Sequence, residues 1–146
     1  MPAIETAIWL ALRGRVETLV LNPIHPVAWP NEAFTAPQTD NLPAPYLKVT
    51  HLPNRTERVF LNGADPHWYR GILQISAMYP LAQLNGEVGA REIAGQVAAH
   101  FPAGLPLYNG AVRVDITARP TVAQGFRDDA SARWLTPVSV PYECFA

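Results

Sequence analysis

The side chains best suited to metal binding are four histidines, and they lie far apart in the sequence. They are His25, His51, His67 and His100. Zinc sites usually take their ligands from short spacings such as HExxH, and neither that spacing nor HxH occurs. His100 falls near the end of a predicted helix, where its side chain can satisfy unpaired carbonyl groups. The sequence therefore predicts no metal site.

Nucleophiles and paired carboxylates are equally poor candidates for catalysis. Cys144 has no recognisable catalytic context, and none of the serines stands in a GxSxG motif. Asp128 and Asp129 are adjacent acids, and neighbouring side chains point apart unless the loop bends, so a solvated loop is the preferred interpretation. The phosphate-binding patterns GxGxxG and GxxxxGK(S/T) are both missing from the sequence. We therefore expect no enzyme activity, no catalytic residue and no cofactor.

Composition predicts one compact domain over residues 1–146 that associates with other protein surfaces. The chain has 146 residues, of which 49% are hydrophobic and only 16% charged. Globular proteins carry about 25% charged residues, so part of this surface is expected to be covered by neighbours. The net charge of −1 and the scattered basic residues predict no specific binding to nucleic acid.

Targeting features point to assembly in a reducing cytoplasm. The lone Cys144 cannot form an intrachain disulfide. The apolar stretch 7–12 follows Glu5, lacks a basic segment before it and ends at Arg13, so it does not resemble a signal peptide. No apolar run reaches the roughly 18 residues that a membrane span needs, and we expect no membrane association.

Hydrophobic periodicity predicts two helices, over residues 3–20 and 86–101. Six prolines in residues 22–45 predict an extended loop, with a short strand at 27–29. A half-buried strand is predicted at 46–52, followed by a projecting β-hairpin that turns at 62–66 and returns along 68–79. Alternating residues predict further strands at 112–119 and 134–144.

Proline placement predicts that strand 134–144 lies at a sheet edge, because Pro137 and Pro141 cannot donate backbone hydrogen bonds. Hairpin connections dominate over β-α-β crossovers. The expected fold class is α+β, with two helices packed on a mixed or mainly antiparallel sheet and a projecting β-hairpin.

Three short stretches stand out: Pro-Tyr-Leu-Lys-Val at 45–49, Tyr-Arg-Gly-Ile-Leu-Gln-Ile at 69–75 and Pro-Val-Ser-Val-Pro-Tyr at 137–142. Together they resemble the tail terminator proteins of long-tailed bacteriophages. The order of the predicted elements is similar as well. The resemblance implies a structural protein of the virion tail, assembled in the host cytoplasm. Such a protein forms a homohexameric ring that caps the tail tube, ends tube polymerisation and provides the surface that joins the head-tail connector protein.

Two regions are the predicted interfaces, because both are expected to extend from the domain and their residues are not needed to build its core. They are the hairpin at 54–67, including Arg55, Arg58 and Phe60, and the proline-rich loop at 30–45. An ordinary solvated hairpin and loop would have the same composition, so that interpretation stays open.

Three other functions remain open at this stage. A head-tail neck or completion protein would share the ring geometry and differ in its partners. A small enzyme or toxin would gain support if Cys144 or the four histidines converged on one pocket. A monomeric adaptor would remain monomeric as its concentration rises.

Overall fold

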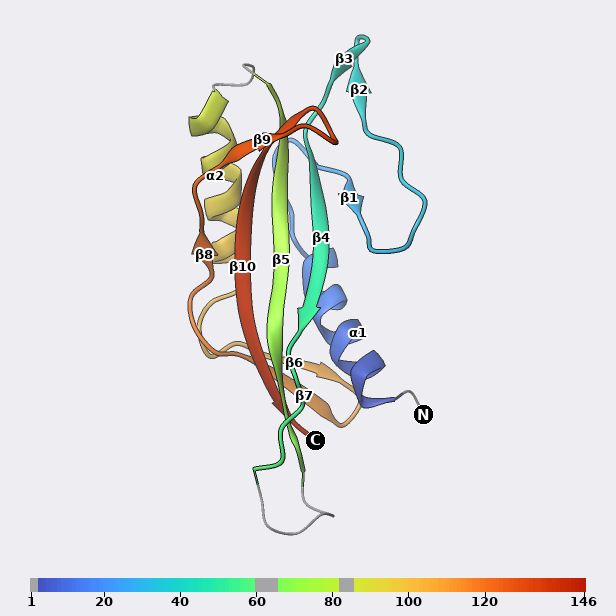
Figure 1. Cartoon of the computed structure of the whole chain (residues 1–146), viewed down its shortest axis with the longest axis vertical. Helices are drawn as coiled ribbons and strands as arrows, with labels where there is room; N and C mark the ends of the chain where they lie inside the picture. Colours follow the sequence, from blue (N-terminus) through green and yellow to red (C-terminus); the bar gives the residue numbers. More distant parts are fainter. Residues whose placement is uncertain (1–2, 60–65, 82–85) are drawn as a thin grey trace.

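The computed structural model describes residues 3–59, 66–81 and 86–146, and within these ranges the chain forms two helices and a mixed sheet (Figure 1). Helix α1 spans Ile4–Glu17 and helix α2 spans Gly86–Ala99. Their buried residues recur at three- and four-residue intervals, which gives each helix one apolar stripe. The predicted α+β class and both helices are confirmed, although each helix ends a few residues earlier than expected.

One sheet contains most of the strands, and its main path has six members. In order across the sheet they are β1 (Val27–Ala28), β4 (Tyr46–Pro53), β5 (Trp68–Pro80), β10 (Arg133–Phe145), β7 (Val112–Ile116) and β6 (Pro106–Asn109). Two short strands, β8 (Thr121–Val122) and β9 (Phe126–Asp128), also pair with β10. β1 is parallel to β4, and the other pairs are antiparallel, so the sheet is mixed.

The prediction that the last strand lies at an edge is wrong, since β10 is central to the sheet. It pairs along its whole length with β5 on one side and with three short strands on the other. The carbonyls of Pro137 and Pro141 accept hydrogen bonds from Ala123 and Thr117, on the side away from β5. The missing N–H of each proline faces that same side, at gaps between β7, β8 and β9. The ladder with β5 therefore stays intact.

The proline-rich segment contains a small ribbon that the sequence interpretation missed. Strands β2 (Gln38–Thr39) and β3 (Leu42–Pro43) pair with each other and form a separate two-stranded sheet. Asp40 and Asn41 connect them with φ values of 52° and 63°. Asparagine and aspartate tolerate this left-handed conformation better than most residues, and it suits a tight hairpin turn. We call residues 30–45 the arm.

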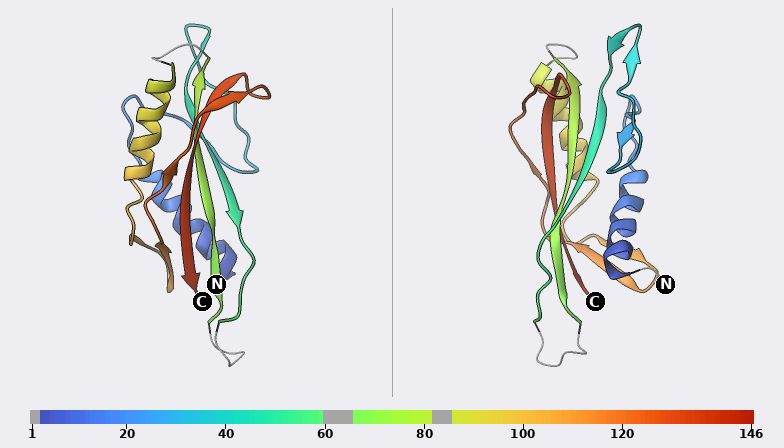
Figure 2. Two further views of the ribbon diagram at one scale, coloured as in Figure 1. Left: turned by 60° about the vertical axis from the view of Figure 1, so that its left-hand side comes forward. Right: turned by 45° about the vertical axis from the view of Figure 1, so that its right-hand side comes forward.

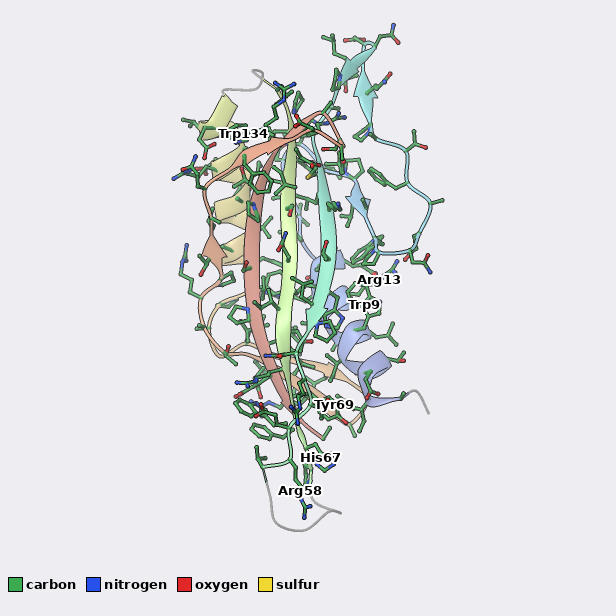
Figure 3. The ribbon with its side chains drawn as sticks, viewed as in Figure 1. Trp9, Arg13, Arg58, His67, Tyr69 and Trp134 are labelled. Carbon is green, nitrogen blue, oxygen red and sulfur yellow. The ribbon has the colours of Figure 1, made fainter. Side chains whose placement is uncertain are left out.

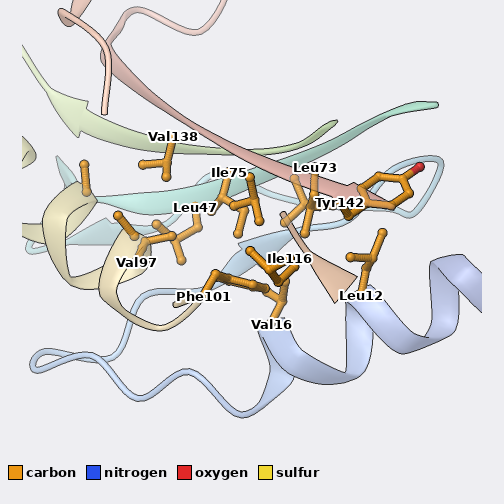
Figure 4. Packing of buried hydrophobic residues seen from close by; sticks show 14 of the residues in the cluster. Leu12, Val16, Leu47, Leu73, Ile75, Val97, Phe101, Ile116, Val138 and Tyr142 are labelled. Carbon is orange, nitrogen blue, oxygen red and sulfur yellow. The ribbon is translucent and has the colours of Figure 1, made fainter. Parts of the chain in front are cut away.

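Both helices contribute to one hydrophobic core that lies against one face of the sheet (Figure 4). Helix α2 contacts β5 and β10, whereas α1 contacts β6 and β7. We call this side of the sheet the inner face. Its fully buried side chains include Leu12, Leu73, Val97, Phe101 and Val140. The opposite side of the long strands β4, β5 and β10 is the outer face, and its side chains come from the alternate residues.

The predicted hairpin after β4 is only partly observable. β4 and β5 pair from Tyr46 with Met78 to Pro53 with Gly71, and an isolated bridge joins Glu57 to Trp68. Residues 62–65 of the predicted turn at 62–66, and Phe60, lie outside the described residues. We call residues 54–59 and 66–70 the stem. In the described part of the chain, neither helix is long and apolar enough to cross a membrane.

Candidate assembly surfaces

The arm and the stem lie at opposite ends of the molecule's longest axis. Figure 1 shows the β2–β3 ribbon at one end of the three long strands and residues 54–59 and 66–67 at the other. The two views of Figure 2 agree with this separation. Both regions were predicted interfaces, and the structure places them too far apart to contact each other within one chain.

The arm extends from the body with almost no burial of its own. None of residues 30–45 is buried, and all of β2 and β3 is exposed. Leu42 exposes 56% of its surface and Phe34 exposes 36%. A two-stranded ribbon without an apolar face against something else is marginally stable. The arm therefore presents apolar surface that the folded monomer does not cover.

One hydrogen bond closes the base of the arm, and contacts from Arg133 and Tyr46 fix that base to the body. The amide of Ala44 donates to the carbonyl of Pro37 at 3.0 Å, which closes the base of the ribbon. Beneath it lies the guanidinium of Arg133, which is 6% exposed and approaches the carbonyls of Pro37 and Ala44 at 3.5 and 3.4 Å. The Phe34 ring packs on Tyr46 with centroids 4.9 Å apart. These contacts orient the arm while leaving its tip uncovered.

A second anchor joins the start of the arm to helix α1. Arg13 donates hydrogen bonds to Glu17 and Glu32, and its guanidinium lies 4.2 Å from the centre of the Trp29 ring. Trp9 packs edge-on against Trp29 with centroids 6.1 Å apart. Figure 3 shows Trp9 and Arg13 on the same helix. The arm is therefore positioned from both of its ends.

At the stem, the structure places two of the three predicted interface residues on the surface. Arg55 and Arg58 are both exposed, and Figure 3 shows Arg58 at the far end of the molecule. Phe60 lies outside the described residues. The stem strands stay together through the Glu57–Trp68 bridge and through the amide of Asn54, which donates to the carbonyl of Arg70 at 2.8 Å.

The outer face beside the stem carries an aromatic and charged platform that sequence interpretation missed. Trp68 and Phe145 are cross-strand neighbours and their rings stack with centroids 6.3 Å apart. The Arg70 guanidinium lies 4.2 Å from the Trp68 ring centre and donates to Glu57 at 3.0 Å. The Trp68 indole N–H donates to Glu143 at 3.1 Å. Aromatic and arginine side chains arranged in this way are common at protein interfaces.

An open groove of about 500 Å³ lies next to this platform. Its outer-face lining includes Leu52, Ile72 and Pro141, which sit side by side in register on β4, β5 and β10. Leu52 is 47% exposed and Ile72 is 38% exposed. Trp68, Arg70 and Glu143 line the groove as well. We call this feature the stem groove.

On the inner face, one row of side chains links α1 to the same three strands. The His51 ring stacks on Trp9 with centroids 5.5 Å apart, and its Nε2 lies 2.6 Å from the Tyr142 hydroxyl. Tyr142 in turn faces Gly71, where an added Cβ would lie 2.7 Å from the tyrosine oxygen. Glycine is required there because the two strands and the ring approach so closely.

Burial controls the protonation of this inner row. Loss of hydration lowers the pKa of His51, and it raises the pKa of Tyr142 to about 12. Both side chains are therefore neutral near pH 7. Burial also raises the pKa of the Cys144 thiol, which keeps it protonated and poorly nucleophilic. An adjoining cavity between Glu5 and Tyr69 measures about 190 Å³, below the usual size of a ligand pocket.

His25, His100 and Asp128 each contact a different part of the fold. His25 is 6% exposed and contacts the Pro23 carbonyl and the Tyr79 hydroxyl. His100 contacts the Arg15 carbonyl and the Thr18 hydroxyl, rather than acting only at the end of its own helix. Asp128 accepts a hydrogen bond from Ser131 at 2.6 Å. Across residues 3–59, 66–81 and 86–146, no three His, Cys, Asp or Glu residues are grouped as a metal site.

Comparison with known proteins first defines the class of the fold. A solved structure superposes on this chain with a TM-score of 0.66 at 25% sequence identity. The match covers 92% of this chain and 93% of the other, so the two share essentially the whole α+β domain. No curated protein matches the sequence.

The family is shown by a sequence model that spans nearly the whole chain. The model for phage tail terminator proteins matches residues 7–142. The chain therefore belongs to the phage tail terminator protein family, as its resemblance predicted. This is a family of structural proteins of the bacteriophage tail, and the chain's role is accordingly a structural one in the tail.

Proposed function

We propose that this protein forms a homohexameric ring on the end of the tail tube, stops further addition of tube subunits and provides the surface that the head-tail connector protein joins. The observation that carries the proposal is the family match over residues 7–142. A growing tube ends in an open docking surface. A closed ring bound there removes the next docking site, so no active site is needed.

The two ends of the molecule support such an assembly. The arm and the stem present different side chains, and they point in opposite directions along the long axis (Figure 1). An interface between two different surfaces of identical copies is heterologous, and it closes into a ring when the rotation between neighbours permits. Arg55 and Arg58 at the stem, together with Phe60 and the arm, are the interface residues of this proposal.

Net charge is compatible with a ring through which DNA passes. The chain has 11 basic and 12 acidic residues, so its surface has no strong attraction for the phosphate backbone. Passage then requires no release from a specific nucleic-acid site. Assembly in the host cytoplasm fits the single Cys144, which is buried and unpaired.

The test is electron microscopy of particles made from a phage genome in which this gene is interrupted. We expect tail tubes that are longer than normal and carry no heads. A plasmid copy of the gene should restore tails of normal length with heads attached. Restoration assigns the defect to this protein rather than to a neighbouring gene.

Other outcomes would change the assignment. Tails of normal length that remain separate from heads would indicate a neck or completion protein. Complete, infectious particles would refute both structural roles. In that case a catalytic or adaptor function would have to be sought.

A further inference from the structure

We infer that the tip of the arm of one copy docks in the stem groove of the next copy. This inference rests on the proposed self-assembly and adds to it the two surfaces that meet. The occupant is a second copy of the same chain. The side chains concerned are Asp40 and Leu42 on the arm, and Ile72, Trp68 and Arg70 in the groove.

The first argument is position. The groove lies beside the stem and the arm lies at the other end of the long strands, so a chain cannot fill its own groove (Figure 1). Contact between the two is possible only between copies. Because the two surfaces differ, repeating the contact joins copies head to tail, which is the arrangement a ring requires.

The second argument is the match of apolar surface. The floor of the groove is the row Leu52, Ile72 and Pro141, which is partly exposed in the monomer. The tip of the arm offers Leu42 and Pro43, both exposed. A volume of about 500 Å³ accommodates a few side chains of this size. Docking would remove both apolar surfaces from water, which is the main favourable term in association.

The third argument is charge. The arm contains two acidic residues, Glu32 and Asp40, and no lysine or arginine. Residues 54–70 contain three arginines, at 55, 58 and 70, against Glu57 and Asp65. Glu143 lines the groove as well and keeps its negative charge, because the Trp68 indole N–H that it accepts is neutral, so the charges of Arg70 and Glu143 balance in the groove lining. The acidic arm is repelled by a second acidic arm but not by the stem, where Arg55 and Arg58 are exposed, and this disfavours arm-to-arm contact.

The fourth argument is preorganisation. Arg133, the Ala44–Pro37 hydrogen bond and the Phe34–Tyr46 contact hold the arm base, and the Asp40–Asn41 turn fixes its tip. The groove is equally preformed, since Trp68 is held by Phe145, Arg70 and Glu143. Association between ordered surfaces avoids the entropy that a flexible arm would lose on binding.

Cysteine cross-linking tests the contact directly. One protein carries Leu42→Cys and a second carries Ile72→Cys. Native Cys144 stays in place because it is 1% exposed. Under mild oxidation an equal mixture should give cross-linked dimers and nothing larger, because each copy has one exposed thiol. The double variant L42C/I72C should instead give a ladder that ends at the size of the closed ring.

The controls separate a specific contact from chance oxidation. Wild-type protein and a mixture of Leu42→Cys with Val88→Cys should give no cross-linked dimer, since Val88 is 72% exposed on α2 and outside the groove. Leu42→Ser and Ile72→Ser should each weaken self-association at least tenfold, whereas Val88→Ser should change it less than twofold. Asp40→Asn keeps a residue suited to the turn and should weaken association more than Asp129→Asn does.

The outcomes distinguish this inference from the proposed function. Light scattering first gives the mass of the wild-type assembly, and the same cross-linking is repeated on purified phage particles that contain the double variant. A ring without the 42–72 cross-link would overturn the arm-in-groove contact and leave the ring standing. A protein that is monomeric by light scattering and gives no cross-linked species in phage particles would overturn both the arm-in-groove contact and the proposed ring. A 42–72 disulfide within one chain would overturn the inference, because the position of the arm and the groove at opposite ends of one copy excludes it.

Discussion

The two faces of the long strands differ in what determines their residues. On the inner face Leu73, Ile75 and Val140 are fully buried in a core shared with both helices. The outer face is buried only toward the arm, where Tyr46, Met78 and Leu135 form a small second cluster.

Toward the stem the outer face is exposed, although it still carries an apolar row and an aromatic pair. The packed helices account for the inner residues. Within residues 3–59, 66–81 and 86–146, no packed helix accounts for the apolar and aromatic residues of the outer face, so assembly is the better explanation for them.

The largest expected difference between the two faces is in the stability lost when one of two neighbouring β5 side chains is shortened. Leu73→Ala, on the inner face, should lower the free energy of unfolding by about 2–5 kcal/mol, because it leaves a cavity in a closed core. Ile72→Ala removes a side chain that is 38% exposed and should cost about 1 kcal/mol. Urea denaturation of the two variants measures the difference. Equal losses would mean that the stem groove is closed in the monomer.

Substitution of Gly71, on the inner face of β5, should cause a smaller loss of stability. In Gly71→Ala the new Cβ would lie 2.7 Å from both the Leu52 carbonyl oxygen and the Tyr142 hydroxyl. We expect a loss of about 1–3 kcal/mol by overpacking, measured by thermal or urea unfolding. Gly95→Ala is the matched control, since nothing lies within 4 Å of its added Cβ in the middle of α2. It should raise stability by about 0.5–1 kcal/mol.

Replacing a hydroxyl group that is buried on the inner face should raise the stability of the protein. Thr136 is fully buried, and its Oγ1 finds no hydrogen-bond partner among the described residues. Thr136→Val keeps the shape and removes the unsatisfied group, so unfolding should require about 1 kcal/mol more. Thr50→Val, on the partly exposed outer face of β4, should change stability by less than half of that. A loss of stability in Thr136→Val would reveal a hidden partner for the hydroxyl.

The smallest expected effect is a dependence on pH that comes from the inner face. Burial lowers the pKa of His51 in the folded state, so the unfolded chain binds more protons at mildly acid pH. The contribution to stability is complete above the unfolded pKa of about 6.5 and is lost as the pH falls toward the lower folded value. Urea titrations between pH 5 and 7.5 should show a flatter profile for His51→Gln, while Ile72→Ala keeps the wild-type slope.

Hydrophobic periodicity was enough to predict the helices and strands whose own residues show a regular apolar pattern. Both helices and the long strand at 68–79 follow from the periodicity of residues such as Ile93, Val97, Leu73 and Ile75. The central position of β10 could not be predicted from Pro137 and Pro141. Whether a proline disrupts a sheet depends on which side its missing N–H faces, and that side is set by distant strands.

The candidate surfaces were predictable only in outline. The proline-rich arm and the exposed Arg55 and Arg58 were expected at interfaces, but the β2–β3 ribbon was missed, although Asp40–Asn41 is a recognisable turn pair. The stem groove has no sequence signature. Its row of Leu52, Ile72 and Pro141 comes from three strands and exists only once their register is fixed.

The central position of β10 also sets the order in which the molecule can be built. β5 and β7 are joined only through β10, which follows every other strand along the chain. Before β10 arrives, the β4–β5 and β6–β7 hairpins are two separate pieces with open edges. Long-range pairing of this kind slows folding, and open edges invite aggregation. A nascent copy therefore cannot join these two pieces until residues 133–145 have been synthesised.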